Sequence, residues 1–269
     1  ASSAASDVYK RQEDGSVLRE IQLHMLDILK VFDKICQEYK IPYWLSSGTL
    51  LGAVRHGGFI PWDDDIDVEL LREDLLRLIP ILQKELPKYG LIYQDHHSDP
   101  GYLFTHTKIR DLKSHICEQN NIDVNYEYRG LFIDIFALEK TTPIIIKLAN
   151  IARCYIRLCG HKNDKWGIKR AFDDCCYHVA HGYYSILRLV SKLFKPKYYY
   201  DQLGSGYIMK RNPQYIFPLQ RIKFEDIEFN APADCDAFLR DAFGDYRRLP
   251  PESERCGHII DADFICNKK

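Results

Sequence analysis

The chain has 269 residues, of which 46% are hydrophobic, and its 37 basic and 38 acidic residues almost cancel. It is long enough to bury a core as one large domain or two small ones, and its charge gives no drive toward a nucleic acid partner. No run of uncharged apolar residues reaches the ~18 that a membrane-spanning helix needs. The nine cysteines, an odd number with one adjacent pair, predict a reducing compartment such as the cytoplasm instead of a disulfide framework.

The N-terminal half is predicted to mix helices and strands. Residues 1–16 are small, polar and without periodicity, which is typical of a disordered or non-native tail. Apolar residues at steps of three and four predict a helix over 17–39, ended with the help of Pro42. The elements predicted after it are strands at 43–45, 65–70, 91–93, 103–110 and 131–136, and helices starting at 48 and over 73–85.

The C-terminal half is predicted to begin with a helical, basic region. Residues 143–194 show helical periodicity, interrupted near 161–167, and we interpret residues 141–210 as a helical insertion or subdomain. Apolar runs on either side of Glu225 and Asp226 then predict a hairpin. Asp234 is placed to cap a helix that ends before Gly244.

A group of aspartates stands out in the N-terminal half. Asp63, Asp64, Asp65 and Asp67 repel one another unless a cation neutralises them, so the sequence favours a metal site. Side chains alternate along a strand, which predicts that Asp65 and Asp67 share one face, about 7 Å apart along the chain. A solvated acidic loop is the plainer alternative. A calcium loop is disfavoured, because Val68 stands where such a loop needs a glycine.

A third carboxylate is predicted to join this site. Asp134 lies in the segment FIDIF, between apolar residues, and an aspartate in such surroundings is costly to bury unless it meets a cation. Together with Asp65 and Asp67 it supplies the oxygen ligands that Mg²⁺ or Mn²⁺ prefers. Taken alone, Asp134 is also compatible with a buried, hydrogen-bonded carboxylate.

A turn of small residues precedes the aspartates. Ser46, Ser47, Gly48 and Thr49 lead from a predicted strand into a predicted helix, so their N–H groups and hydroxyls are expected to face an anion such as phosphate. Taken alone, such a turn is usually a simple helix cap. A phosphate site opposite a metal site, however, is typical of phosphoryl transfer, in which a carboxylate accepts the proton of the attacking group.

The segment SSGTLLGAVRHGGFIPWDDDIDV, residues 46–68, resembles the signature of the LicD family, which belongs to the nucleotidyltransferase fold superfamily shared with polymerase β. Further matches are Lys108 to Asp111, Gly130 to Phe136, Phe224 to Phe229, Phe243 to Tyr246, and Leu249 to Pro251 leading to Arg255 and His258. The resemblance implies an α+β nucleotidyltransferase domain over 17–269: a small mixed sheet flanked by helices, with the helical insertion near 141–210.

The resemblance also implies an activity. Members of the family transfer a phosphorylated alcohol, such as phosphocholine or an alditol phosphate, from a CDP-linked donor to a hydroxyl of a cell-surface glycan or its lipid-linked precursor, with release of CMP. Lipopolysaccharide, teichoic acid and capsule are such glycans, and the related fukutin and fukutin-related protein are ribitol-phosphate transferases. By this mapping Asp65 and Asp67 bind Mg²⁺ or Mn²⁺, and Asp134 completes the metal site and acts as general base.

The resemblance extends to residues that would bind the CDP-choline or CDP-alditol donor. The substrate-binding candidates are Ser47, Gly48 and Thr49 for the diphosphate, Arg55, Lys108 and Arg110 for phosphate or base, and His258. The three cations are equally compatible with surface or structural roles, and a single late histidine is often structural. The turn departs from the superfamily's commoner Gly-Gly or Gly-Ser, which leaves the identity of the phosphate-binding donors open.

The helical insertion carries two further features. Basic residues form stripes on apolar segments at 144–158 and 183–200, which suits either an anionic membrane surface, as at the inner face of the membrane, or core-packed helices with solvated basic faces. Cys154, Cys159, Cys175 and Cys176 resemble a cysteine set of fukutin-related protein and are compatible with a structural Zn²⁺ site or with ordinary buried cysteines.

Two other functions remain open from the sequence. Asp63 to Asp67 also fit the Asp-x-Asp metal motif of a glycosyltransferase that uses a nucleotide-sugar, although the turn and Asp134 argue against it. A non-enzymatic glycan-binding or membrane-binding module is the second alternative. The presence of all three expected carboxylates makes a degenerate enzyme the weaker interpretation.

Overall fold

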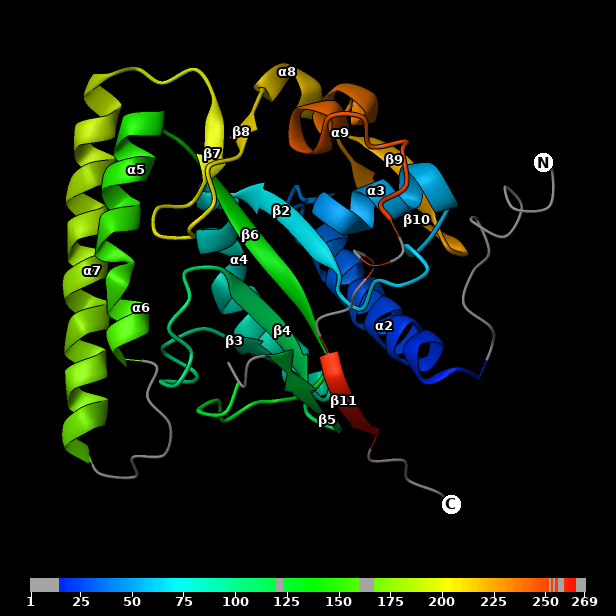
Figure 1. The fold of residues 1–269 in the computed structure, drawn as a ribbon, viewed down its shortest axis with the longest axis horizontal. Helices are drawn as coiled ribbons and strands as arrows, with labels where there is room; N and C mark the ends of the chain where they lie inside the picture. The colour runs from blue at the N-terminus through cyan, green and yellow to red at the C-terminus, as the bar shows by residue number, and fades with distance from the viewer. Residues whose placement is uncertain are drawn as a thin grey trace.

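The computed structural model describes residues 15–119, 123–159, 167–251, 253, 255 and 259–264 (Figure 1). The helices are α2 (Val17–Glu38), α3 (Ser47–His56), α4 (Arg72–Glu85), the 3₁₀ helix η1 (Leu86–Tyr89), α5 (Pro143–Ala152), α6 (Cys154–Cys159), α7 (Gly167–Leu193), α8 (Pro213–Ile216) and α9 (Cys235–Phe243). The strands are β1 (Trp44–Leu45), β2 (Asp67–Leu71), β3 (Leu91–Gln94), β4 (Thr107–Asp111), β5 (Ser114–Glu118), β6 (Phe132–Lys140), β7 (Tyr199–Asp201), β8 (Lys210–Arg211), β9 (Gln220–Phe224), β10 (Ile227–Ala231) and β11 (Ile259–Phe264).

A mixed sheet of seven strands forms the centre of the molecule. Its main order is β1-β2-β6-β4-β3, with β7 paired to β6 and β8 paired to β7. Only the pair β2–β6 is parallel among these pairings. The long strand β6 pairs with β2 and β4 over its first part and with β7 at its end. The expected small mixed sheet flanked by helices is therefore confirmed.

Helices α2 and α4 pack against one face of the sheet and close the main core (Figure 1). The apolar face of α2, including Met25, Leu29 and Phe32, is fully buried, as the periodicity predicts. Ser16, which the sequence assigns to the tail, is the N-cap of α2 and its hydroxyl accepts the N–H of Arg19. The tail prediction for residues 1–14 lies outside the described residues.

Helices α5, α6 and α7 stand beside the sheet over a second, smaller core (Figure 1). The helical part of the predicted insertion ends at Leu193, and Tyr199–Asp201 returns to the main sheet as β7. The sequence did not indicate this strand, because it has only three residues. None of the helices in the described ranges combines the length and apolarity that a membrane span requires.

The C-terminal elements follow the prediction closely. Strands β9 and β10 pair as a hairpin in which Ile227 faces Phe224, and Glu225 in the turn has a positive φ of 59°. The side chain of Glu225 accepts hydrogen bonds from buried Arg19, with 2.6 Å between Arg19 Nη2 and Glu225 Oε2. Asp234 caps α9 through the N–H of Ala237, and the helix ends at Phe243, directly before Gly244. The hairpin is thus fixed to α2 by a partly buried ion pair.

Candidate active site

Three charged side chains form a row across three strands. Asp67 and Asp134 are register partners in the parallel pair β2–β6, and Lys108 and Asp134 are register partners in the antiparallel pair β4–β6. Register partners on neighbouring strands point to the same face, about 5 Å apart. The row lies on the face that turns away from the main core, and Lys108 Nζ is 2.8 Å from Asp134 Oδ1.

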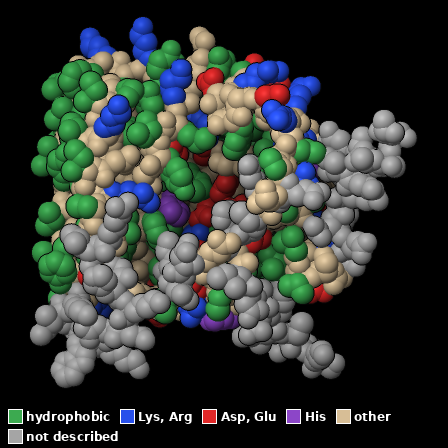
Figure 2. All heavy atoms as spheres, in the orientation of Figure 1, with side chains coloured by type: hydrophobic (Ala, Val, Ile, Leu, Met, Phe, Trp, Pro, Cys, Tyr) green, Lys and Arg blue, Asp and Glu red, His purple; other side chains and the backbone are tan. Residues whose placement is uncertain are grey.

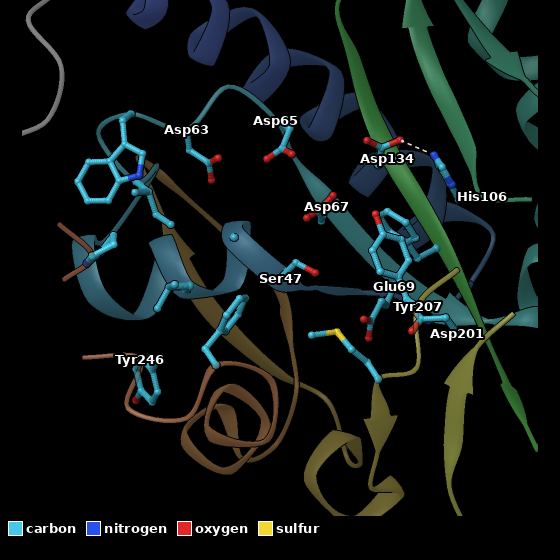
Figure 3. Close-up of a pocket in the computed structure, with 18 of the residues that line it drawn as sticks. Ser47, Asp63, Asp65, Asp67, Glu69, His106, Asp134, Asp201, Tyr207 and Tyr246 are labelled. Atoms are coloured by element: carbon cyan, nitrogen blue, oxygen red, sulfur yellow. Dashed lines mark ion pairs between the residues drawn. The ribbon is translucent and has the colours of Figure 1, made fainter. Parts of the chain in front are cut away.

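The aspartates that precede Asp67 do not all point toward the pocket. The strand begins at Asp67, so Asp65 lies in the loop before it, and the prediction that strand alternation pairs Asp65 with Asp67 was wrong. Asp65 nevertheless faces the same pocket as Asp67, and so does Asp63 (Figure 3). Asp64 is buried in another direction, where its Oδ2 accepts the N–H of Ile259 at 2.7 Å. Asp63 is thus a site residue that the sequence analysis left out.

The carboxylates at this site disfavour one another's ionised forms. Burial raises the pKa of Asp67 well above its usual range, and Asp65, Asp134 and Asp63 raise it further. The positive charge of Lys108 lowers the same pKa and so offsets only part of the effect. Burial, followed by Asp65 and Asp64, likewise raises the pKa of Asp63. A bound cation would relieve this repulsion.

The donor set fits a hard divalent cation, because Asp63, Asp65, Asp67 and Asp134 offer oxygen ligands around one pocket. Within the described residues, no three His, Cys, Asp or Glu side chains already form a group that could hold a metal ion. Carboxylates that repel one another are expected to draw together only when a cation joins them. The metal site therefore stays a prediction.

The N-terminus of α3 faces this row of charges. Ser47, at the start of the helix, has a positive φ of 45° and lines the pocket with Gly48. A Cβ atom at Gly48 would lie 2.8 Å from Asp63 Oδ2, so a larger residue here would displace the carboxylate of Asp63. Thr49 does not line the pocket; its hydroxyl accepts the N–H of Asp67 at 2.8 Å and ties the helix to β2. Ser47 and Gly48 remain as the residues placed to meet an anion.

The resulting pocket has a volume of about 930 Å³ and opens on the front of the molecule, where Figure 2 shows acidic side chains at its base. Its far wall is built by the C-terminal segment, including Tyr246, Arg248 and Pro251. Arg55 lines the pocket and donates from Nη1 to the carbonyl oxygen of Tyr246 at 2.8 Å. The C-terminal segment is therefore held at the pocket by a residue of α3.

Aromatic rings cover one side of the row. His106 stacks on Phe136 with 5.1 Å between ring centroids, and Phe136 meets Tyr207 edge to face. Burial lowers the pKa of His106 to about 4, so the ring is neutral near pH 7, and its Nε2 lies 3.8 Å from Asp134 Oδ1. Burial, followed by Asp67 and Asp134, raises the pKa of Tyr207. These rings restrict the access of water to the row.

A second acidic group borders the pocket near β8. Glu69 forms a buried ion pair with Arg211, with 2.7 Å between Oε1 and Nη2, and also accepts the indole N–H of Trp44. Asp201 lies beside this pair, and burial, followed by Glu69, raises its pKa to about 7. The ion pair joins β2 to β8 and so fixes the position of the pocket wall that carries Asp201.

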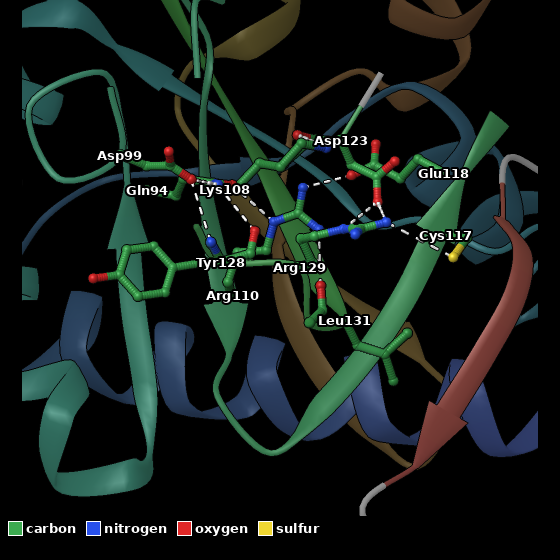
Figure 4. A network of polar contacts seen from close by, with 12 residues as sticks. Gln94, Asp99, Lys108, Arg110, Cys117, Glu118, Asp123, Tyr128, Arg129 and Leu131 are labelled. Atoms are coloured by element: carbon green, nitrogen blue, oxygen red, sulfur yellow. Dashed lines mark hydrogen bonds and ion pairs between the residues drawn. The ribbon is translucent and has the colours of Figure 1, made fainter. Parts of the chain in front are cut away.

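The structure separates the other predicted cations. Lys108 lines the pocket, whereas Arg110, on the same strand, does not. The buried guanidinium of Arg110 donates to Gln94 Oε1 at 2.7 Å and to the carbonyl oxygen of Gly130 at 2.8 Å, and it pairs with Glu118 (Figure 4). The proposed phosphate contact of Arg110 is therefore replaced by a structural role. His258 lies outside the described residues.

Several pocket residues were not predicted from the sequence: Asp63, Glu69, His106, Glu118, Asp201 and Tyr207. Asp63 was visible in the aspartate cluster but was not assigned as a metal ligand. Glu69 follows the same cluster on β2, two residues after Asp67. His106 and Asp201 belong to no short motif, since they reach the pocket through the pairing of β4 with β6 and of β6 with β7. A sequence pattern carries no signal for such long-range pairing.

The predicted zinc ligands do not all meet. Cys159 and Cys176 interact closely enough that Cys176 contributes to the raised pKa of Cys159, after burial and Asp173. Cys154 and Cys175 are exposed. In the part of the chain that the structure describes, no cysteine group that could hold a metal is found. The zinc site stays a prediction, and metal analysis of the purified protein tests it.

Comparison with known proteins places this pocket in a family. Residues 40–153, which contain the turn and the whole charged row, match the family model described as "LicD/FKTN/FKRP, nucleotidyltransferase domain". The chain is 30% identical over 267 residues to the lipopolysaccharide cholinephosphotransferase LicD of Haemophilus influenzae, a match that spans 92% of this chain and 98% of that protein. The chain therefore belongs to the LicD family.

Two eukaryotic relatives match over shorter regions. The human ribitol 5-phosphate transferase FKRP is 54% identical over 35 residues, which is 13% of this chain and 7% of that protein. The mannosyltransferase regulator 4 of Saccharomyces cerevisiae is 28% identical over 127 residues, which is 46% of this chain and 10% of that protein. Each match covers only a small part of the relative's own length.

Proposed function

We propose that this chain is a phosphotransferase that moves a phospho-alcohol, phosphocholine or an alditol phosphate, from a CDP-linked donor to a hydroxyl of a glycan and releases CMP. The observation that carries the proposal is the row of Asp67, Asp134 and Lys108 opposite the N-terminus of α3, in a member of the LicD family. The printed activities of the relatives, cholinephosphotransferase and ribitol 5-phosphate transferase, support it. We also infer a nucleotidyltransferase fold from the description of the family model.

The residues of the pocket suit the steps of this reaction. The N–H groups of Ser47 and Gly48 would hold the diphosphate of the donor. Asp65, Asp67 and Asp134 would hold Mg²⁺ or Mn²⁺, which neutralises charge on the phosphate oxygens. Lys108 would move from Asp134 toward the phosphate once a cation takes its place.

The proposed chemistry is a displacement at phosphorus. The oxygen of the acceptor hydroxyl forms the new bond to the phosphorus of the phospho-alcohol, the bond to the bridging oxygen breaks, and CMP leaves with the electron pair. Asp134 accepts the proton of the acceptor hydroxyl. The neighbouring rings of His106 and Phe136 keep this carboxylate away from bulk water.

The acceptor and the location belong to the same proposal. The acceptor would be a cell-surface glycan or its lipid-linked precursor, in keeping with the lipopolysaccharide in the name of the bacterial relative. We place the reaction in the cytoplasm, at the inner face of the membrane. The described cysteines, all of them free thiols, are compatible with that reducing compartment.

The test measures nucleotide release by the full chain. Mg²⁺-dependent release of CMP from CDP-choline or CDP-ribitol, in the presence of lipopolysaccharide, is expected to exceed release of UDP from UDP-sugars. UDP release would instead support a glycosyltransferase that uses Asp65 and Asp67 as its metal motif. Glycan binding without release from either donor class would support a non-enzymatic module, a function that the name of the yeast relative, a regulator, keeps open.

A further inference from the structure

The helical insertion exposes apolar side chains on one side of the molecule. Figure 2 shows hydrophobic side chains gathered where Figure 1 places α5 and α7. We call this surface the insertion face and define it by Ile144 and Ile151 of α5 and Val179, Ile186, Leu189 and Leu193 of α7, each at least 60% exposed. Single exposed apolar residues are common on soluble proteins, but a contiguous group of this kind marks an interaction surface.

The spacing of these residues makes the insertion face continuous. Ile144 and Ile151 are seven residues apart, as are Val179, Ile186 and Leu193, so each set lies along one side of its helix. From Val179 to Leu193 the stripe runs about 21 Å along α7. The two helices are in contact through their opposite sides, which form the second core.

The charge along most of the insertion face is positive. Lys147, Lys192 and Lys195 are exposed along it. The segments 141–159 and 175–200, which supply most of α5, α6 and α7, contain no aspartate or glutamate. Exposed apolar groups bordered by lysine are typical of helices that lie in the interface of an anionic bilayer.

A basic groove of about 750 Å³ adjoins the insertion face. It is lined by Leu189 of the face itself and by Arg72, Lys140, Lys192 and Lys195. Two carboxylates also line it, Glu73 and Glu139, and Glu139 is already paired with Arg188, with 2.7 Å between Oε2 and Nε. The groove is therefore suited to anionic groups at the edge of the apolar surface.

We propose that the insertion face is a docking surface for an anionic lipid bilayer. The apolar side chains of α5 and α7 enter the boundary between headgroups and acyl chains, and the lysines of the groove contact lipid phosphates. A second copy of this chain fits less well, because a symmetric contact would bring lysines together without acids from these segments. The inference does not depend on the reaction proposed above.

The experiment is sedimentation of the full chain with vesicles. We expect binding to vesicles that contain phosphatidylglycerol, weak binding to pure phosphatidylcholine, and release at ~0.5 M salt, where charges are screened within a few Å. The triple change Ile186→Gln, Leu189→Gln and Leu193→Gln, and the double change Lys192→Glu and Lys195→Glu, should each lower the affinity by roughly tenfold or more. Circular dichroism and the melting temperature show whether each variant is folded.

Matched controls come from the turn after β4, away from the insertion face. Leu112, 48% exposed, and the exposed Lys113 are changed in Leu112→Gln and Lys113→Glu, which should bind as the wild type does. Equal binding by folded face variants and the wild type, or no binding to anionic vesicles at all, overturns the proposal. Self-association of the wild type in ultracentrifugation, lost in the triple variant together with no vesicle binding, would assign the face to a second copy.

Discussion

Asp67 of β2 and Asp134 of β6 are register partners in a parallel strand pair, so two carboxylates from distant parts of the chain share one face of the sheet. The N–H of Asp134 donates to the carbonyl oxygen of Ile66 at 2.8 Å, which fixes this register directly beside the loop of aspartates. The two side chains therefore act on each other whether or not a cation is bound.

Asp134→Asn tests the proposed general base. Because an amide cannot accept the proton of the acceptor hydroxyl, turnover should fall by about 10²–10⁴-fold while the protein stays folded. Release of CMP at saturating donor gives the change in kcat. Asp64→Asn is the control: its side chain keeps an oxygen for the N–H of Ile259 and should leave turnover near the wild-type value. Wild-type turnover by Asp134→Asn would show that Asp134 is not the general base.

Asp67→Asn tests the metal site without any assay of turnover. Burial and its acidic neighbours raise the pKa of Asp67, so ionised Asp67 destabilises the metal-free fold near neutral pH, and the amide should relieve this. Mg²⁺ at about 100 times its Kd should stabilise the wild type by ~2.7 kcal/mol and the variant much less. Melting temperatures with and without Mg²⁺ measure both effects. An equal response of both proteins to Mg²⁺ would contradict the assignment.

The local parts of the site could be predicted from the sequence. The turn before α3 and the acidic cluster before β2 are contiguous, and the short-range rules for helix starts apply to them directly. Asp134 was predictable because a charged residue in an apolar strand needs a partner. The N-cap of α9 at Asp234 and the hairpin at Glu225 follow from the same kind of local chemistry.

The non-local parts could not be predicted. Arg110 and Lys108 are both cations on one strand, and only the tertiary structure shows that Arg110 is buried among Gln94, Gly130 and Glu118. Asp201 reaches the pocket because β7 pairs with the end of β6, which no periodicity indicates. The exposed apolar side of α7 is a similar case, since an amphipathic pattern does not say which helix faces lack a partner.

Lys108→Gln and Arg110→Gln should separate function from stability. Loss of Arg110 leaves the half-buried Glu118 and the buried carbonyl oxygen of Gly130 without their donor, which should cost about 3–5 kcal/mol of unfolding free energy. Lys108 faces the pocket, so its replacement should lower kcat/KM for the donor, which Arg110→Gln should leave unchanged. Urea unfolding and CMP release measure the two quantities. If Arg110→Gln instead lowered kcat/KM without lowering the stability, Arg110 would be assigned to donor binding.

Asp201 predicts a specific dependence of stability on pH. Burial and Glu69 raise its pKa to about 7 in the folded protein, against ~3.9 in an unfolded chain. Below pH ~4 the folded and unfolded states both carry the proton of Asp201, so this carboxyl does not lower the free energy of unfolding. As the pH rises toward 7, only the folded state still binds this proton, and the free energy of unfolding falls. Each pKa unit is worth ~1.4 kcal/mol, so the loss should reach a few kcal/mol and then level off above pH 7.

Asp201→Asn should remove this slope, because the amide does not titrate, whereas the exposed Asp226→Asn should keep it. Urea unfolding between pH 5 and 8 measures the slopes, and identical slopes in the wild type and Asp201→Asn would show that the carboxyl of Asp201 titrates normally in the folded protein.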